Sequence, residues 1–112
     1  MELVDYAFVA DRTSFAAGAP IAFNATNAGQ HPHELVVLQL PEGVRAEQVL
    51  EDPAVQERVR FVGGTFAEPG QAAPPLVLVD LEPGTYTMAC YVDVPEGVPH
   101  VMRGMVAEVT VQ

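Results

Sequence analysis

Apolar and polar positions alternate along this chain in short runs that are separated by proline and glycine turns. Alternation over four to eight residues is typical of β-strands with one buried face. Runs of this kind occupy residues 3–9, 20–25, 33–40, 76–81, 85–91 and 105–111. The run at 33–40 is apolar on both faces, as expected for a strand near the middle of a sandwich.

The spacing of apolar residues changes between residues 45 and 60, where valines and a leucine stand among Glu, Gln and Arg. This stripe predicts one helix. Pro53 inside it predicts a kink, or a new helix with Asp52 as N-cap and Pro53 as first helical residue. Residues 63–75 are rich in Gly, Pro and Ala and are predicted to form a loop.

Together these runs predict an all-β fold, a Greek-key β-sandwich of about seven to eight strands with one helical insertion around residues 45–60. The length of 112 residues fits one domain that spans residues 1–112.

The charge of the chain restricts its partners. Fifteen acidic residues face five basic ones, all of them Arg, for a formal charge of -10. Such a field repels nucleic acid and favours a basic protein partner. We expect no integral membrane segment, because no apolar run is long enough, and no signal peptide at residues 1–6. The oligomeric state stays open.

Cys90 is the only cysteine, so it cannot form an intrachain disulfide. Period-2 geometry places Tyr86, Met88 and Cys90 on the core face of their strand. A lone cysteine of this kind is usually a small buried apolar residue. However, the spacing Cys-x9-His-x4-Met places His100 and Met105 in the loop that follows. A thiolate, an imidazole and a thioether favour copper over magnesium or calcium.

A second imidazole must come from His31 or His33, which precede the strand at 33–40. His33 is favoured because it directly precedes the apolar run, and His31 is its only substitute. Met102 competes weakly with Met105. Two His and one Cys with a weak axial Met form the ligand set of a blue-copper electron-transfer site. We find no Ser-His-Asp arrangement, phosphate-binding glycine motif or carboxylate pair, and therefore do not expect an enzyme.

Three segments carry a resemblance to the cupredoxin family, which includes plastocyanin, azurin and the blue-copper domain of copper nitrite reductases. Residues 27–33 (Asn-Ala-Gly-Gln-His-Pro-His) resemble the Asn-x-Gly-x-x-Pro-His segment of this family. Residues 81–90 resemble the strand that leads into the copper cysteine, and residues 97–100 with 104–105 resemble the loop after it.

The resemblance implies one copper ion held by His33, Cys90, His100 and Met105, which cycles between Cu(I) and Cu(II) as the chain passes single electrons to a redox partner protein. It also implies an extracytoplasmic or periplasmic location. A copper carrier with the same ligands and a metal-free interaction module remain as alternatives.

The chain departs from the family at three places. The Cys90 to His100 spacing is longer than in plastocyanin and closer to that of nitrite reductases. Glu34 stands where many members have Asn, and its carboxylate is expected to point outward. Ala89 stands where plastocyanin has a surface tyrosine on its remote electron route, which puts that route in doubt here.

We expect His100 to be the ligand nearest the surface, with the partner docking beside it. The residues expected to form an apolar docking patch around it are Val94, Pro95, Val98, Pro99, Val101 and Met102.

Overall fold

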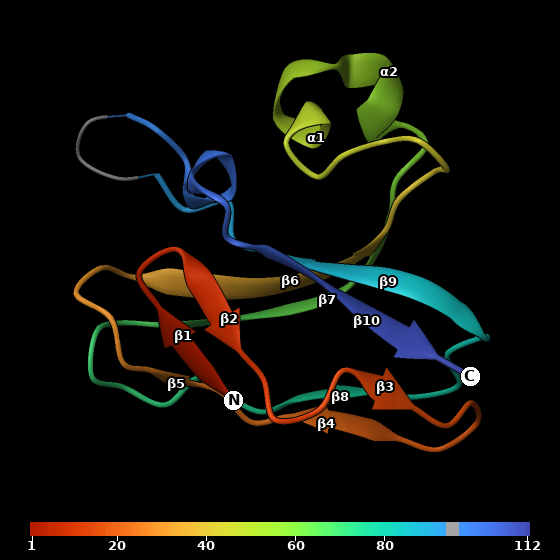
Figure 1. Ribbon diagram of the computed structural model, residues 1–112, viewed down its shortest axis with the longest axis horizontal. Helices are drawn as coiled ribbons and strands as arrows, with labels where there is room; N and C mark the ends of the chain where they lie inside the picture. Colours follow the sequence, from red (N-terminus) through yellow and green to blue (C-terminus); the bar gives the residue numbers. More distant parts are fainter. Residues whose placement is uncertain (94–96) are drawn as a thin grey trace.

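The computed structural model describes residues 1–93 and 97–112 (Figure 1). These residues form ten strands, two short α-helices and one 3₁₀ helix. The strands are β1 (Glu2–Val4), β2 (Ala7–Val9), β3 (Ser14–Phe15), β4 (Ile21–Phe23), β5 (Thr26–Asn27), β6 (His33–Gln39), β7 (Arg60–Ala67), β8 (Leu76–Leu78), β9 (Gly84–Ala89) and β10 (Val106–Val111). The helices are α1 (Gln48–Glu51), α2 (Pro53–Gln56) and the 3₁₀ helix η1 (His100–Arg103).

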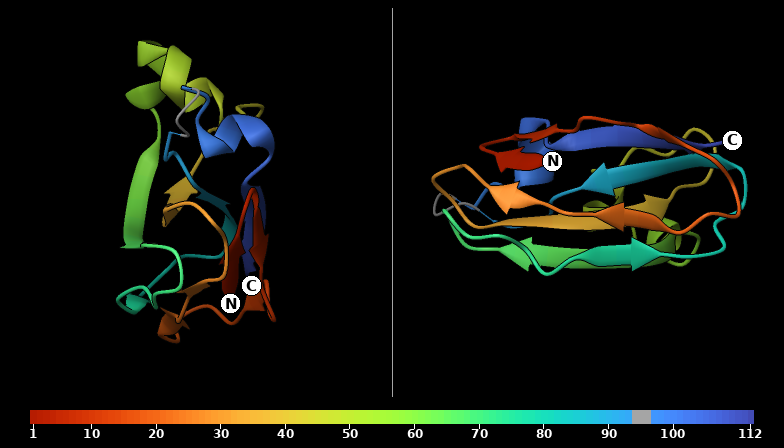
Figure 2. Two further views of the ribbon diagram at one scale, coloured as in Figure 1. Left: turned by 90° about the vertical axis from the view of Figure 1, so that its left-hand side faces the viewer. Right: turned by 90° about the horizontal axis from the view of Figure 1, so that it is seen from below.

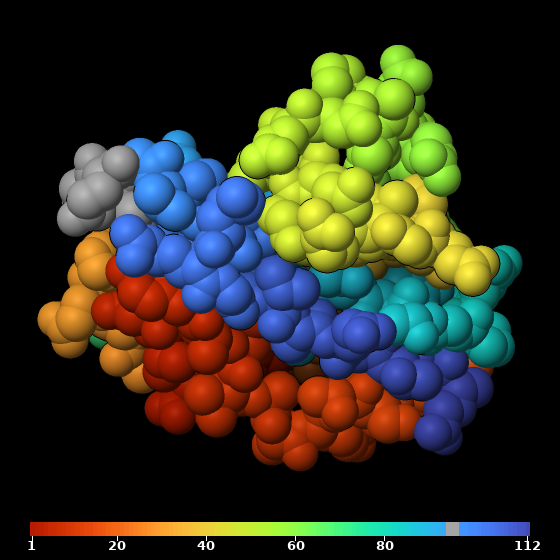
Figure 3. All heavy atoms as spheres, turned by 45° about the horizontal axis from the view of Figure 1, so that its top comes forward, coloured from red at the N-terminus to blue at the C-terminus, as the bar shows by residue number. Residues whose placement is uncertain are grey.

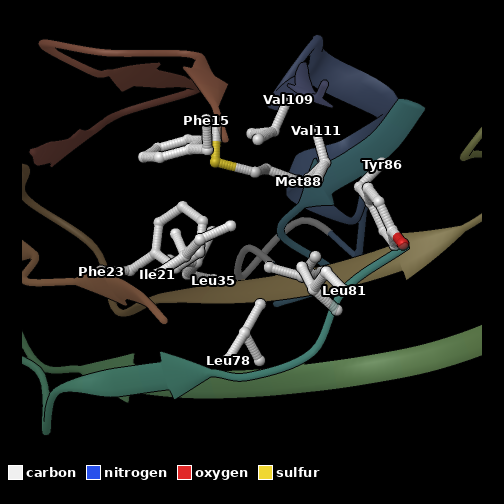
Figure 4. Close-up of a cluster of buried hydrophobic side chains, with 11 residues drawn as sticks. Phe15, Ile21, Phe23, Leu35, Leu78, Leu81, Tyr86, Met88, Val109 and Val111 are labelled. Atoms are coloured by element: carbon white, nitrogen blue, oxygen red, sulfur yellow. The ribbon is translucent and has the colours of Figure 1, made fainter. Parts of the chain in front are cut away.

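The strands form a sandwich. One layer is a five-stranded sheet in the order β3-β10-β9-β6-β7, and it faces a three-stranded sheet, β2-β1-β5, and a two-stranded sheet, β4-β8. Between them lies a cluster of buried side chains from β3, β4, β6, β8, β9 and β10, with Tyr86 and Met88 on the inner face of β9 (Figure 4). The predicted all-β sandwich is confirmed, with more strands than expected because β3 and β5 are too short to show alternation.

The longest strand, β7, contradicts the prediction of a helix end and a loop at residues 60–67. It pairs antiparallel with β6 from His33↔Ala67 to Gln39↔Arg60. Gly63 and Gly64 suggested a loop, but the second layer approaches β7 closely here. A Cβ on Gly63 would lie 2.9 Å from the side chain of Leu78. Glycine inside a strand often marks such a close approach.

The run at residues 3–9 is a hairpin and not one strand. Val4 pairs with Ala7, so Asp5 and Tyr6 form the turn between β1 and β2. Tyr6 has a φ of 74°, a conformation in which glycine or asparagine is usual. The sequence therefore carried no glycine or proline turn signal at this point.

The helical insertion consists of two short helices that divide at Asp52. The Asp52 side chain accepts a hydrogen bond from the Ala54 backbone N–H at 3.0 Å, and Pro53 is the first helical residue. Of the two predicted alternatives, the new start at Pro53 is confirmed. Figure 2 shows this segment projecting from the strand layers.

The segment that leads into α1 covers part of the outer face of β9. Ala46, Ala89 and Val101 form a small buried cluster there. Ala89, at the position of the plastocyanin surface tyrosine, is therefore fully buried. No helix within the described ranges is long and apolar enough to cross a membrane.

Candidate metal centre

Strand pairing brings His33 and Cys90 together. β6 and β9 are antiparallel, with Val36 opposite Ala89, so the start of β6 lies beside the end of β9. The loop after Cys90 then returns through η1, where the His100 N–H donates to the Val92 carbonyl at 2.8 Å. The Met105 N–H donates to the His100 carbonyl at 3.2 Å, and the Cys90 N–H donates to the Met105 carbonyl at 3.3 Å. These bonds fix the loop against the strand end.

Three donor atoms converge at this point. The Nδ1 atoms of His33 and His100 are 3.0 Å apart, and Cys90 Sγ lies 3.5 Å from His100 Nδ1 and 4.0 Å from His33 Nδ1. All three residues are fully buried. The point equidistant from the three atoms is about 2.1 Å from each, close to the length of metal bonds to imidazole nitrogen and thiolate sulfur, about 2.0 to 2.3 Å. A metal ion at this point would therefore make bonds of ordinary length to all three atoms with the ligands where they are.

The hydrogen bonds of His33 show which of its nitrogens is available to a metal. Its Nε2 lies 2.8 Å from Asp5 Oδ1. Because a carboxylate only accepts, Nε2 carries the proton and Nδ1 presents its lone pair. A thiol sulfur and two imidazole nitrogens are a soft donor set that suits copper. The residues present therefore fit a copper ion.

The electrostatic surroundings favour the uncharged forms of Cys90 and His100 in the metal-free site. Burial raises the pKa of the Cys90 thiol above its ordinary value, although the backbone N–H groups of Glu34 and Val92 act in the opposite direction. Burial lowers the pKa of His100, and the neighbouring His33 lowers it further. At neutral pH the thiol is protonated and His100 is neutral, so a metal that binds here displaces the thiol proton.

The structure also places the competing residues. Met105 is fully buried in the same apolar cluster as Cys90, whereas Met102 is 46% exposed. His31 is outside the triangle and lies with its Nδ1 3.4 Å from Asp5 Oδ2. This placement favours Met105 and His33 over their alternatives.

We expected His100 to be the ligand nearest the surface, but it is as fully buried as His33, Cys90 and Met105. It is fully buried because two side chains cover it. The ring of Tyr6 meets it edge-on with the centroids 5.2 Å apart, and the ring of His31 does so at 5.9 Å. Among the predicted patch residues, Val98 and Met102 are exposed but Val101 is buried, and Val94 and Pro95 lie outside the described residues. The rings of Tyr6 and His31, and not an apolar patch, therefore lie directly over His100.

Glu34 also differs from the expectation, because its carboxylate does not point outward. Its Oε1 accepts a hydrogen bond from the Tyr91 backbone N–H at 2.9 Å. Its own backbone N–H donates to Cys90 Sγ at 3.3 Å. Glu34 thus connects the start of β6 both to the Cys90 sulfur and to the backbone of the next residue, Tyr91.

Two residues at this site were not identified by the sequence reasoning. Asn27 belongs to the segment that resembles the family; it is fully buried and donates to the carbonyls of His31 at 2.8 Å and Ala67 at 2.9 Å. It accepts from the Gly29 N–H at 2.9 Å and so shapes the loop before His33.

The other residue is Asp5, which belongs to the hairpin turn between β1 and β2. Partial burial tends to raise its pKa, but hydrogen bonds from His33, Gln30 and His31 outweigh this effect and hold the pKa below the ordinary value. The only sequence signal was a polar pair, Asp5 and Tyr6, inside an alternating run.

Comparison with solved structures supports the fold. The reduced auracyanin of the photosynthetic bacterium Roseiflexus castenholzii is 23% identical with a TM-score of 0.68, over 99% of this chain and 94% of that one. Auracyanin A, a "blue" copper protein of Chloroflexus aurantiacus, is 18% identical with a TM-score of 0.64, over 100% and 97%. Reduced rusticyanin is 20% identical with a TM-score of 0.60, over 88% and 61%. No protein-family model and no curated protein sequence matches the chain. At these identities the likeness shows that the chain has the cupredoxin fold.

Proposed function

We propose that this chain binds one copper ion through His33, Cys90 and His100, with Met105 as a further, weaker ligand, and that it carries single electrons. The observation behind this proposal is the buried triangle of two imidazole nitrogens and one sulfur, with sides of 3.0, 3.5 and 4.0 Å. It occurs in a fold shared with a protein described as a blue copper protein.

The bound ion supplies the redox change, between the +1 and +2 states. The chain supplies rigidity, because the backbone bonds among Cys90, His100 and Met105 hold the loop in one position. It also excludes water, since all three triangle residues are fully buried. The Glu34 N–H donates to Cys90 Sγ and stabilises negative charge on the sulfur.

Met105 enters this proposal through its burial beside Cys90 and its backbone bonds to both neighbouring ligands. A thioether in this position tunes the reduction potential of the ion. Met105→Leu is expected to retain copper with a shifted potential, because the three strong ligands remain.

Electron transfer is favoured over the copper-carrier alternative by the burial of the ligands. A carrier must present its ligands to the protein that accepts the metal, but His33, Cys90 and His100 have no exposed surface. The metal-free module is disfavoured because two imidazole nitrogens 3.0 Å apart in a buried site are of little use to an interaction surface. We therefore infer an electron carrier that is not an enzyme on its own.

The test is titration of the metal-free protein with Cu(II) at neutral pH, followed by visible absorption and voltammetry. The expected result is one equivalent of copper, an intense blue or green band and a reversible one-electron couple. Cys90→Ser and His33→Gln should abolish the band, and the matched variant His31→Gln should retain it. Tight Cu(I) binding without a coloured Cu(II) form would support the carrier, and absence of stoichiometric copper would support the metal-free module.

For the partner, we infer a basic redox protein, because the formal charge of the chain is -10 and opposite charge accelerates encounter at low salt. It docks at the end of the sandwich that carries Val98 and Met102, which are 37% and 46% exposed. With a basic cytochrome c as probe, Val98→Lys or Met102→Lys should slow transfer and leave the copper spectrum intact. Unchanged kinetics would exclude this docking site.

The location that suits such a carrier is extracytoplasmic, as the family resemblance implies. Fractionation of the native cells with an antibody against the chain tests this, and recovery with cytoplasmic markers would contradict it.

A further inference from the structure

The turn between β1 and β2 contacts both imidazoles of the candidate site. Its two residues are Asp5, whose carboxylate meets His33, and Tyr6, whose ring meets His100. Figure 1 places this hairpin next to the segment with η1, and Figure 3 shows the N-terminal atoms (red) packed against the atoms of that segment (blue). A segment almost thirty residues before His33 is thus part of the surroundings of the metal.

The Asp5 carboxylate is held in one orientation. Oδ1 lies 2.8 Å from His33 Nε2 and accepts from the backbone N–H groups of Gln30 at 3.0 Å and His31 at 3.3 Å. Oδ2 accepts from Gln30 at 3.1 Å and lies 3.4 Å from His31 Nδ1. A carboxylate fixed by several donors cannot rotate away without losing these bonds, so it faces His33 permanently.

Gly29 shows independently that the chain makes room for this pair. A Cβ at residue 29 would collide with Asp5 Oδ1 and would lie 2.8 Å from His33 Nε2. The φ of Gly29 is not positive, so its backbone conformation does not require glycine. The close approach of Asp5 and His33 does.

The backbone of Tyr6 has an unfavourable conformation in this turn. A non-glycine residue in the left-handed region costs about 1 to 3 kcal/mol and persists where the surrounding structure demands it. The φ of 74° lets the ring cover His100, and the Arg103 guanidinium carbon lies 5.3 Å from the centroid of the Tyr6 ring. Strain beside a functional site is a common sign that the segment has a role there.

We propose that Asp5 is a positioning residue of the copper site, which holds His33 as its Nε2–H tautomer and favours Cu(II) over Cu(I). This rests on the proposed function. A carboxylate that accepts the remote N–H of a ligand imidazole fixes the ring and increases the basicity of the ligating nitrogen. Its negative charge also stabilises the more positive oxidation state. Both effects lower the reduction potential.

The experiment compares wild type, Asp5→Asn and Asp5→Ala, with Asp11→Asn as matched control. Asp11→Asn removes the same charge from an exposed residue outside the site. Loss of an outer-shell partner typically costs about 10- to 100-fold in metal affinity. When the affinity for Cu(II) falls and the affinity for Cu(I) does not, each tenfold loss of Cu(II) affinity raises the potential of a one-electron couple by about 59 mV. We expect this rise in both Asp5 variants, and a far smaller one in Asp11→Asn.

A second measurement does not need copper. In the ¹⁵N NMR spectrum of the metal-free protein, His33 should be the Nε2–H tautomer in wild type and Asp11→Asn, and a mixture of tautomers in Asp5→Ala. Asp5→Asn is nearly isosteric and keeps an acceptor oxygen, so it tests the charge if Asp5→Ala does not fold.

The outcomes separate this inference from the proposed function. Wild type without stoichiometric copper would refute the proposed function and, with it, the effect on potential. Wild type that binds copper, with Asp5 variants whose potential equals that of Asp11→Asn, would refute the role of Asp5 alone. An unchanged His33 tautomer in Asp5→Ala would refute the positioning.

Discussion

Replacing Gly29 with alanine is expected to break the contact between Asp5 and His33. The new methyl carbon would collide with the Asp5 carboxylate and lie 2.8 Å from His33 Nε2 and 3.0 Å from the Asp5 backbone N. Carbon atoms in ordinary contact are about 3.5 to 4.0 Å apart. One of the two side chains must therefore move.

Either movement has a similar cost. Overpacking of a tight site costs about 1 to 3 kcal/mol. If Asp5 instead swings into solvent, a hydrogen bond to a charged group is lost, at about 1.5 to 3 kcal/mol. The free energy of unfolding should thus fall by about 1.5 to 3 kcal/mol. At about 4 °C per kcal/mol for a domain of this size, the melting temperature should drop by about 6 to 12 °C.

The assay is thermal unfolding of the metal-free protein by circular dichroism. Gln30→Ala is the control, because its side chain is exposed, and its effect should stay within about 0.5 kcal/mol. In an Asp5→Ala background the added cost of Gly29→Ala should shrink, because the main obstacle is gone. A Gly29→Ala protein that melts within about 1 °C of wild type and retains its copper affinity would refute this reasoning.

Substitutions at three further residues test other contacts. Burial, together with the Glu47 and Glu34 carboxylates, raises the pKa of Tyr91 to about 12, while the unfolded phenol ionises near about 10. The contribution of Tyr91 to stability is therefore full below about pH 10 and falls towards pH 12, by at most about 3 kcal/mol; urea unfolding across this range should show this loss in wild type, and Tyr91→Phe should lose less stability over the same range. Asn27→Ala leaves buried carbonyls without donors and should cost about 1 to 3 kcal/mol in the same assay, with weaker copper binding; full retention of both would contradict its role in the loop. Met88→Ala opens a cavity in the main core and should cost about 2 to 5 kcal/mol, with Met88→Leu below about 1.5 kcal/mol and the copper band unchanged in both.

Local patterns were sufficient where the signal lies within a few residues. The alternation around Tyr86 and Met88 predicted a core face on β9, and the pair Asp52 and Pro53 predicted a helix start. Both depend on backbone periodicity or capping, which neighbouring residues determine. The spacing from Cys90 to His100 and Met105 belongs to the same class, because one loop carries all three.

Prediction failed where a residue responds to a neighbour that is distant in sequence. Residues 60–67 form a strand through their pairing with β6, and glycine fits at residue 63 because a Cβ there would lie 2.9 Å from Leu78 of the opposite layer. The turn at Tyr6 has no glycine or proline, so its strained conformation could not be inferred from its own residues. His100 was expected to be the ligand nearest the surface because nothing near it in the sequence indicates the covering rings of Tyr6 and His31.

The sequence alone was enough to identify the type of sandwich and the residues whose chemistry suits copper, because periodicity and ligand type are properties of short segments. The three-dimensional arrangement was needed to show that His33 Nδ1, His100 Nδ1 and Cys90 Sγ converge within 4.0 Å. It was also needed to find Asp5 behind His33. Pairing of β6 with β9 and folding of the first hairpin against η1 join segments far apart in the chain, and such contacts depend on how the layers pack as a whole.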